Sequence, residues 1–189
     1  MDALALLTAD HNRVRGLFAR FQEAEEAKDT GALATLTETI LTELEVHTTI
    51  EEEIFYVEVS AADDEIREVV TEGVEEHHVV KILAEEIKQL EPGGEVWVAK
   101  CKVLIENVEH HAEEEETELF PSVRKALSAD ALVDMAQRME ARKAALGAPT
   151  TEDKAHLTVD ELKRLAQEQQ IPGRSSMDRE ELVATVAPE

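Results

Sequence analysis

Apolar residues recur at intervals of three and four along the first 120 positions of the chain, which is the spacing of one face of an α-helix. Three short polar or Gly/Pro-containing breaks divide the pattern into four segments. The predicted helices cover, in chain order, about residues 2–27, 32–60, 64–90 and a fourth segment that contains Trp97 and ends at Phe120-Pro121. Short connections force neighbouring helices antiparallel, so the pattern predicts an all-α, up-down-up-down four-helix bundle.

A weaker apolar pattern after Pro121 predicts a fifth helix packed on the bundle, with apolar positions at Leu127, Leu132, Met135, Met139 and Leu146. The segment that follows is rich in small and polar residues, as linkers are. Beyond it, apolar positions on both sides of a turn at 171–174 predict two short helices. The predicted domains are therefore a bundle at 1–146, a linker at 147–156 and a small helical module at 157–189.

The charge balance limits the partners of the chain. It carries 43 acidic and 19 basic residues, a formal net charge of −24, which repels phosphate backbones and anionic membranes. A basic, apolar leader and a run of about 18 apolar residues are both missing, so we expect a cytoplasmic protein without membrane contact. The single cysteine, Cys101, excludes an internal disulfide and is expected to be a small buried side chain.

Four of the seven histidines, His11, His47, His77 and His111, each complete the apolar stripe of a different predicted helix. The stripes run 4, 7, 11, 14, 18; then 36, 40, 44, 47, 51, 54; then 70, 74, 77, 80, 83; and finally 97, 101, 104, 108, 111, 115. Each of these histidines is therefore expected to point into the bundle.

Two stripes continue into a glutamate four residues after the histidine, at Glu51 and Glu115, which places both groups on one helical face. The surrounding segments, 47–57 and 111–121, align over eleven residues. They share the histidine, two glutamates, an apolar position and an aromatic residue at the same offsets, so one motif occurs twice.

These side chains fall at a common depth in an antiparallel bundle. At about 1.5 Å per residue they lie within roughly 10 Å along the axis, a span that suits two neighbouring ions. Burying the groups unpaired would cost roughly 2 kcal/mol or more each, whereas imidazole and carboxylate together are good ligands for iron, manganese or zinc. We therefore predict metal ligands at His11, His47, Glu51, His77, His111 and Glu115.

A single histidine on an apolar face is more often a core residue that is hydrogen-bonded to a neighbour, and this remains the alternative for each histidine taken alone. His78 and His110 lie one residue off their stripes and are expected to flank the site as hydrogen-bond partners. His156 lies in the predicted linker and is expected to be solvated.

Residues 1 to about 145 resemble the hemerythrin-like, or HHE cation-binding, domain family. The resemblance rests on Ala9-Asp10-His11, the segment Glu75 to Lys81, and the two motifs His47 to Tyr56 and His111 to Pro121. It implies a four-helix bundle with two irons joined by an oxo or hydroxo bridge, zinc and manganese being less favoured. It also implies a function in oxygen binding, in oxygen or nitric oxide sensing, in iron handling or in peroxide chemistry.

The chain departs from the oxygen-carrying members of that family in two places. Those proteins carry a second histidine one turn before the third-helix ligand, where this chain has Gly73, and Lys81 lies one turn after. They also place an aspartate five residues after the last histidine, whereas Glu115 follows His111 by four. One protein ligand is thus missing, which favours chemistry with an exogenous ligand over simple oxygen storage.

The tail, 157–187, resembles the helix-loop-helix unit at the N-terminus of the transcription terminator Rho and in SAP-like modules, which are often linked to nucleic acid. Its basic residues are Lys163, Arg164, Arg174 and Arg179. They are offset by the acidic residues Asp160, Glu161, Asp178, Glu180 and Glu181, so a docking or packing role is expected ahead of nucleic-acid binding.

We therefore expect a non-haem di-iron protein that binds or decomposes a small oxidant (peroxide, oxygen or nitric oxide), with peroxide disproportionation, a catalase-like reaction, as the first activity to assay. The alternative is a metal-based sensor that signals through its C-terminal module. Ferritin-like storage is disfavoured because the only Glu-x-x-His spacing is Glu75 with His78, and a metal-free bundle is the fourth possibility. Tyr56 and Glu76 are candidate proton donors, with a core aromatic and a solvated helix face as the alternative interpretations.

Overall fold

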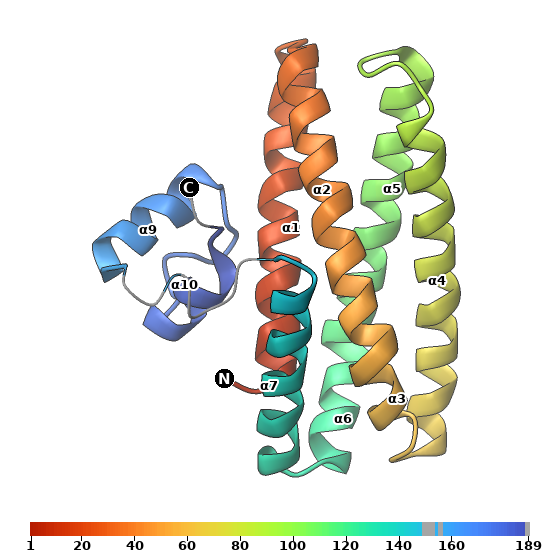
Figure 1. Ribbon diagram of the computed structural model, residues 1–189, viewed down its shortest axis with the longest axis vertical. Coiled ribbons are helices and arrows are strands. Elements are labelled where there is room, and N and C mark those ends of the chain that lie inside the picture. The colour runs from red at the N-terminus through yellow and green to blue at the C-terminus, as the bar shows by residue number, and fades with distance from the viewer. Residues whose placement is uncertain (149–153, 155–156, 188–189) are drawn as a thin grey trace.

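A computed structural model describes residues 1–148, 154 and 157–187, and within these residues the chain is all-helical. Four long helical segments form the predicted bundle (Figure 1). They are α1 (Ala3–Glu26); α2 (Thr30–Ile50) continued by the π-helix η1 (Glu51–Phe55) and α3 (Tyr56–Val59); α4 (Asp64–Lys88); and α5 (Glu95–Glu114) continued by the π-helix η2 (Glu115–Leu119) and α6 (Phe120–Ala126).

Three aspartates fix where the first three bundle helices begin. The carboxylates of Asp2, Asp29 and Asp63 accept hydrogen bonds from the backbone N–H groups of Ala5, Ala32 and Glu65. Such caps satisfy N–H groups that would otherwise lack a partner in the first turn. The connections between the helices are short, so successive helices run antiparallel as predicted.

The prediction that the fourth helix ends at Phe120-Pro121 was wrong. The helix continues through Pro121 to Ala126. Pro121 follows η2 directly and lies in the first turn of α6, where a backbone N–H is not needed for the helical hydrogen-bond pattern. A proline at this place therefore does not break the helix.

The apolar stripes form two separate clusters of the bundle core. One cluster contains Leu7, Ile50 and Val70 and lies toward the α3–α4 end, and the other contains Val14, Leu44 and Val80 and extends toward the opposite end. The four stripe histidines fall between these positions in sequence and are buried. Val74 departs from its predicted stripe, since 39% of its surface is exposed.

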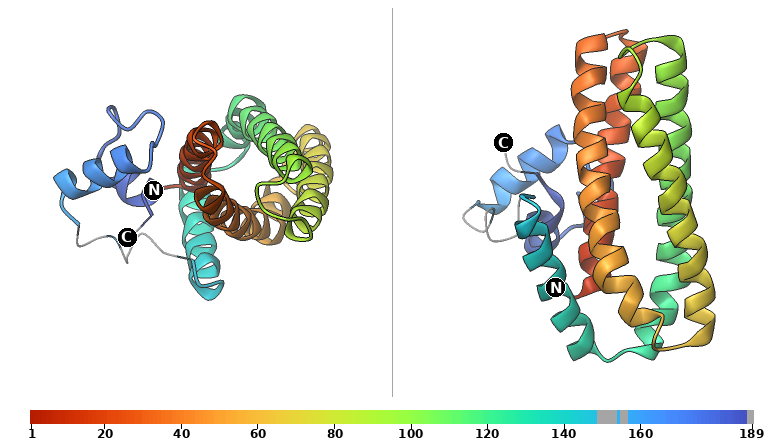
Figure 2. Two further views of the ribbon diagram at one scale, coloured as in Figure 1. Left: turned by 90° about the horizontal axis from the view of Figure 1, so that it is seen from above. Right: turned by 45° about the vertical axis from the view of Figure 1, so that its right-hand side comes forward.

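The predicted fifth helix is α7 (Ala129–Ala145), which lies against α1 outside the four-helix bundle (Figure 2). The C-terminal module contains α9 (Val159–Glu168) and α10 (Arg179–Thr185) around its own apolar cluster, and α10 packs on α1. Most of the predicted linker, including His156, lies outside the described residues. No helix in the described part of the chain has the length and apolar character needed to span a membrane.

Candidate metal centre

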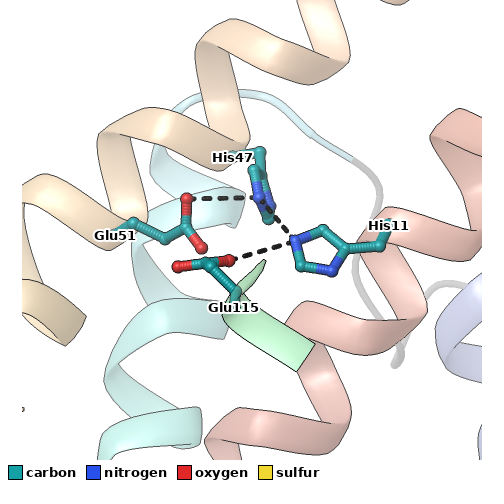
Figure 3. A group of neighbouring side chains, drawn as sticks. All are labelled: His11, His47, Glu51 and Glu115. Carbon is teal, nitrogen blue, oxygen red and sulfur yellow. Dashed lines mark hydrogen bonds and ion pairs between the residues drawn. The ribbon is translucent and has the colours of Figure 1, made fainter. Parts of the chain in front are cut away.

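All six predicted ligands come together at mid-depth in the bundle, and each is at most 6% exposed. Figure 3 shows four of them, His11, His47, Glu51 and Glu115, pointing toward one another from three helical segments. Their ligand atoms, like those of the second group Glu51, His77 and His111, all lie within 4.8 Å of one another. Glu51 belongs to both groups, so the two groups share one carboxylate.

The histidines form two pairs, and each buried carboxylate lies between the pairs. Nε2 of His11 is 3.2 Å from Nε2 of His47, and Nε2 of His77 is 3.0 Å from Nε2 of His111. The Oε2 atom of Glu51 lies 3.2 Å from His47 and 3.4 Å from His77. The Oε2 atom of Glu115 lies 3.3 Å from His11 and 3.9 Å from His111. Each carboxylate thus contacts one histidine of each pair.

A second carboxylate faces the outer nitrogen of every one of these histidines. The Nδ1 atoms lie close to Glu116 for His11 (2.8 Å), Glu52 for His77 (3.0 Å), Glu76 for His111 (2.6 Å) and Asp10 for His47 (3.6 Å). An Nδ1–H that points at a carboxylate leaves Nε2 free to offer its lone pair to the interior. The four rings are therefore oriented as metal ligands are.

This arrangement repeats about an approximate two-fold relation that follows from the duplicated motif. Glu52 and Glu116 occupy the same offset in the two motifs, and each faces the histidine of an α1 or α4 helix. The aromatic residues of the two motifs pack on the same two histidines. Phe120 stacks on His11 with ring centroids 6.0 Å apart, and Tyr56 stacks on His77 with ring centroids 5.4 Å apart. One difference between the two halves is the hydroxyl group on the Tyr56 side.

The π-helices begin at the two inner glutamates. Both Glu51 in η1 and Glu115 in η2 are the first residues of a five-residue π turn. A π turn contains one more residue than an α turn, which changes the direction of the side chains that follow, and such turns occur frequently at functional sites. Here the turn allows the glutamate, its successor and the motif aromatic all to face the centre.

The hydroxyl of Tyr56 donates a hydrogen bond to Oε1 of Glu115 at 2.9 Å and lies 3.5 Å from Nε2 of His77. Burial raises the pKa of Tyr56 well above its usual value, and the charges of Glu51 and Glu115 act in the same direction. The tyrosine therefore stays protonated and acts as a donor beside the centre.

Burial raises the pKa of both inner carboxylates, and their different neighbours make the two pKa values differ. It raises the pKa of Glu51 well above its ordinary value, and the neighbouring Glu115 adds to this effect. Burial alone would also raise the pKa of Glu115, but the contact of its Oε2 atom with Nε2 of His11 at 3.3 Å and the charges of the nearby histidines lower it to about 2. Burial, reinforced by His111, lowers the pKa of His77 to about 2, so this ring is neutral, as a metal ligand must be.

The residues fit a metal site because the centre leaves buried acceptor atoms without donors. Both oxygens of Glu51 and Oε2 of Glu115 have no hydrogen-bond partner although they are buried. A buried carboxylate without a donor or a cation is strongly destabilising. Cations held between these oxygens and the Nε2 atoms would remove that penalty.

A small cavity lies next to the four histidines. Its volume is about 20 Å³, and apolar side chains such as Val14, Leu44 and Val80 line it together with the rings. A space of this size holds one water-sized molecule.

His78 and His110 do not provide the hydrogen bonds that we expected from them. Both are exposed, and His110 contacts Glu114 instead.

The sequence analysis did not predict three carboxylates that face the ligand rings, Asp10, Glu52 and Glu116. Their signal was present in the sequence, because the repeated motif contains the second glutamate and an acidic residue precedes both His11 and His77. Glu76 is likewise half-buried and bound to His111, not merely solvated.

Comparison with known proteins agrees with this geometry. The family model described as the hemerythrin HHE cation binding domain matches residues 2–123. A protein named DNA nickase, from Nostoc sp. (strain PCC 7120 / SAG 25.82 / UTEX 2576), is 27% identical over 145 residues, which are 76% of this chain and 39% of that protein. The chain thus spans about two fifths of that relative. No solved structure matches the chain.

Proposed function

Since the chain belongs to the hemerythrin HHE cation-binding family, we propose that its bundle holds two irons and uses them to bind or decompose a small oxidant such as peroxide, oxygen or nitric oxide. The proposed ligands are His11, His47, Glu51, His77, His111 and Glu115. The observation that carries the proposal is the position of the two inner carboxylates, each of which contacts one histidine of each pair. A carboxylate in that position can bridge two ions.

An oxo or hydroxo group would complete the bridge between the irons. Iron bound there would supply redox chemistry and an open coordination position, because four imidazoles and two carboxylates leave the centre one protein ligand short of the oxygen carriers. The same donor types also bind zinc and manganese, so metal analysis has to distinguish the three.

The remaining residues of the site would select the ligand and hold a proton. The cavity of about 20 Å³ beside the histidines admits only a small molecule. The Tyr56 hydroxyl is 3.4 Å from Nε2 of His111 and remains protonated, so we propose it as the hydrogen-bond donor to a ligand at the centre. In peroxide disproportionation, two peroxide molecules yield one oxygen molecule and two waters, so no other oxidant or reductant is needed.

Metal analysis and an optical spectrum test the proposal. The protein purified from iron-replete cells should contain about two irons per chain, and His47→Ala should lose iron and the associated absorption band. His78→Ala is the matched control, because His78 is an exposed histidine beside the ligand His77. Iron-free wild-type protein, or unchanged metal content and stability in His47→Ala and His111→Ala, would support the metal-free bundle instead.

Peroxide disproportionation is the first activity to assay. We expect oxygen release from peroxide by the iron-loaded protein and not by His111→Ala. If the loaded protein binds nitric oxide or oxygen reversibly without releasing oxygen from peroxide, then the centre is a binding site and the catalase-like activity is absent.

Ferritin-like storage has no support in the geometry, because Glu75 and His78 are both exposed.

A second candidate function is a sensor that signals through the C-terminal module, and a buried chain of charges favours it. Asp10 faces Nδ1 of His47 and is bound by Lys143 at 2.6 Å and by Arg13 at 2.6 Å. Arg13 also donates to the backbone carbonyl of Ala184 in α10 at 3.3 Å. A route of one ion-pair contact, from His47 to Asp10 at 3.6 Å, followed by hydrogen bonds through Arg13 therefore joins a proposed ligand to the module.

Lys154 strengthens this connection. Its ammonium group is 1% exposed and donates to the carbonyls of Ala184 and Val186, at the C-terminal end of α10. Cations are favourable at a helix C-terminus. A change of charge at the metal centre would alter the electric field on Asp10 and on its partners Arg13 and Lys143. The packing of α10 on α1 would change as a result.

Hydrogen exchange tests the sensor proposal. Backbone amides of residues 157–187 should exchange at different rates in the oxidised and reduced iron-loaded protein, and Lys143→Met should abolish the difference. Arg138→Met is the control, since Arg138 forms an exposed surface pair with Glu58. Equal exchange in both oxidation states would exclude the sensor route, as would unchanged partner binding after deletion of residues 150–189.

Nucleic acid is the less favoured partner, although the Nostoc relative is named DNA nickase. A DNA-directed activity needs a basic surface, and the net charge of −24 opposes one. Within the module, Arg174 donates to the carbonyl of Ile171 and Arg164 pairs with Glu168. A plasmid-nicking assay with and without chelator checks this expectation, and no nicking is expected.

A further inference from the structure

A third group of candidate metal ligands lies at the surface near the buried centre. It consists of Glu76, His110 and Glu114, whose ligand atoms lie within 4.8 Å of one another. Nε2 of His110 is 3.5 Å from Oε1 of Glu114, one helical turn away, and both side chains are accessible, at 65% and 38%. One imidazole and two carboxylates form a donor set for a divalent transition-metal ion.

A cavity connects this surface group with the buried ligands. Its volume is about 50 Å³, and it is lined by Glu76 and Glu114 from the outer group and by His111 and Glu115 from the inner one. Gly73 is one of the residues that line this cavity. A Cβ atom there would lie 3.1 Å from the Tyr56 hydroxyl and 3.4 Å from Cε1 of His111.

The inner end of the cavity reaches a buried carboxylate of the proposed centre that lacks a hydrogen-bond donor. Glu115 is 3% exposed, and its Oε2 atom has no hydrogen-bond partner. Two further glutamates, Glu72 and Glu118, line the same cavity. A passage with acidic walls raises the local concentration of cations. The passage thus runs from an outer donor set to a buried, unpartnered carboxylate oxygen.

We propose that Glu76, His110 and Glu114 form an outer binding site for a divalent transition-metal ion, from which the ion passes along the cavity at Gly73 to the buried centre. Glu76 joins the two sites directly, because it also accepts the Nδ1–H of His111 at 2.6 Å. The outer binding stands on its own donor set, whereas the inward passage rests on the proposed function of the buried centre.

Loading of the metal-free full-length chain with Zn²⁺ alone tests the proposal. Uptake is followed by stopped flow against a chromogenic chelator, and equilibrium titration counts tight and weak equivalents. We expect one weak equivalent in the wild type that is lost in His110→Ala and in Glu114→Gln, with uptake into the buried centre slowed about tenfold and its final occupancy unchanged. His78→Ala should behave like the wild type, because His78 is exposed but is not a member of this group.

Two results would overturn the proposal. Unchanged uptake and an unchanged weak equivalent in both variants would exclude the outer site, and loss of the weak equivalent at an unchanged uptake rate would exclude the inward passage. Zn²⁺ that remains bound after gel filtration reports the buried centre alone. Failure of the proposed function would therefore appear as a wild type that retains no Zn²⁺, whereas failure of the outer site leaves that retention intact.

Discussion

Nδ1 of His11 lies 2.8 Å from Oε1 of Glu116, so this carboxylate holds the ring with Nε2 directed into the bundle. Glu116 is itself held by Arg15, whose guanidinium contacts both carboxylate oxygens. Burial would raise the pKa of Glu116, but the hydrogen bonds from His11 and Arg15 lower it, so the group is ionised. An ionised carboxylate behind a ligand ring makes the ring a stronger electron donor.

Replacing Glu116 by glutamine should therefore weaken metal binding without removing a ligand. We expect affinity for Zn²⁺ or Fe²⁺ to fall by about 10- to 100-fold, the usual effect of losing a carboxylate behind a ligand histidine. Chelator competition measures the change. Glu113→Gln is the matched control, because Glu113 is an exposed glutamate of the same helical segment. Equal affinities in the two variants would show that Glu116 does not act through His11.

The contact between Gly73 and Tyr56 predicts a coupling that a double-mutant cycle can measure. Alanine is favoured over glycine within a helix by about 1 kcal/mol, but a Cβ at position 73 would lie 3.1 Å from the Tyr56 hydroxyl. In the Tyr56→Phe background the hydroxyl is missing, so Gly73→Ala should raise the free energy of unfolding by up to about 1 kcal/mol. In the wild-type background the gain should be smaller or absent.

The same double-mutant cycle measures the contribution of the Tyr56 hydroxyl to the free energy of unfolding. Tyr56→Phe removes the hydrogen bond to Glu115 and should cost the metal-free protein about 1.5–3 kcal/mol, as expected for a hydrogen bond to a charged group. Urea unfolding of the four proteins supplies every value. If Gly73→Ala has the same effect in both backgrounds, the hydroxyl does not limit the space at position 73.

Helix periodicity was sufficient to predict the bundle and the burial of the six proposed ligands, because these histidines and glutamates occupy the same stripes as the apolar core. Other features depend on information that periodicity does not contain. A π turn adds one residue without changing the residue types around it, so η1 and η2 were not predicted, although the repeat of the motif was visible. The buried Lys154 was missed because its partners are backbone carbonyls of a distant helix.

Cys101 should react slowly with thiol reagents in the folded protein. Burial raises the pKa of its thiol to about 11, although a contact with Thr37 acts in the opposite direction. At pH 8 the thiolate population is then about 100-fold below that of an ordinary cysteine, and the side chain is also covered. A colourimetric disulfide reagent should label the native protein at least about 100-fold more slowly than the protein in urea. Similar rates would show that the helices around Cys101 open readily.

Lys154 should make the stability of the protein depend on pH above neutrality. Burial lowers its pKa from 10.5 to about 7, and the nearby Arg13 and Lys143 act in the same direction. Between these two values the unfolded chain binds a proton that the folded protein does not, so the Lys154 contribution to the free energy of unfolding increases as the pH rises. From pH 7 to pH 9 the gain should be about 2 kcal/mol.

Urea unfolding at several pH values measures this gain as the difference between the wild type and Lys154→Met, in which other titrating groups cancel. The wild type should become more stable relative to the variant as the pH rises from 7 to 9. Lys163→Met, which removes an exposed lysine of α9, should instead run parallel to the wild type. Parallel curves for Lys154→Met as well would mean that Lys154 stays charged in the folded protein, with the Asp10 carboxylate outweighing burial and the two neighbouring cations.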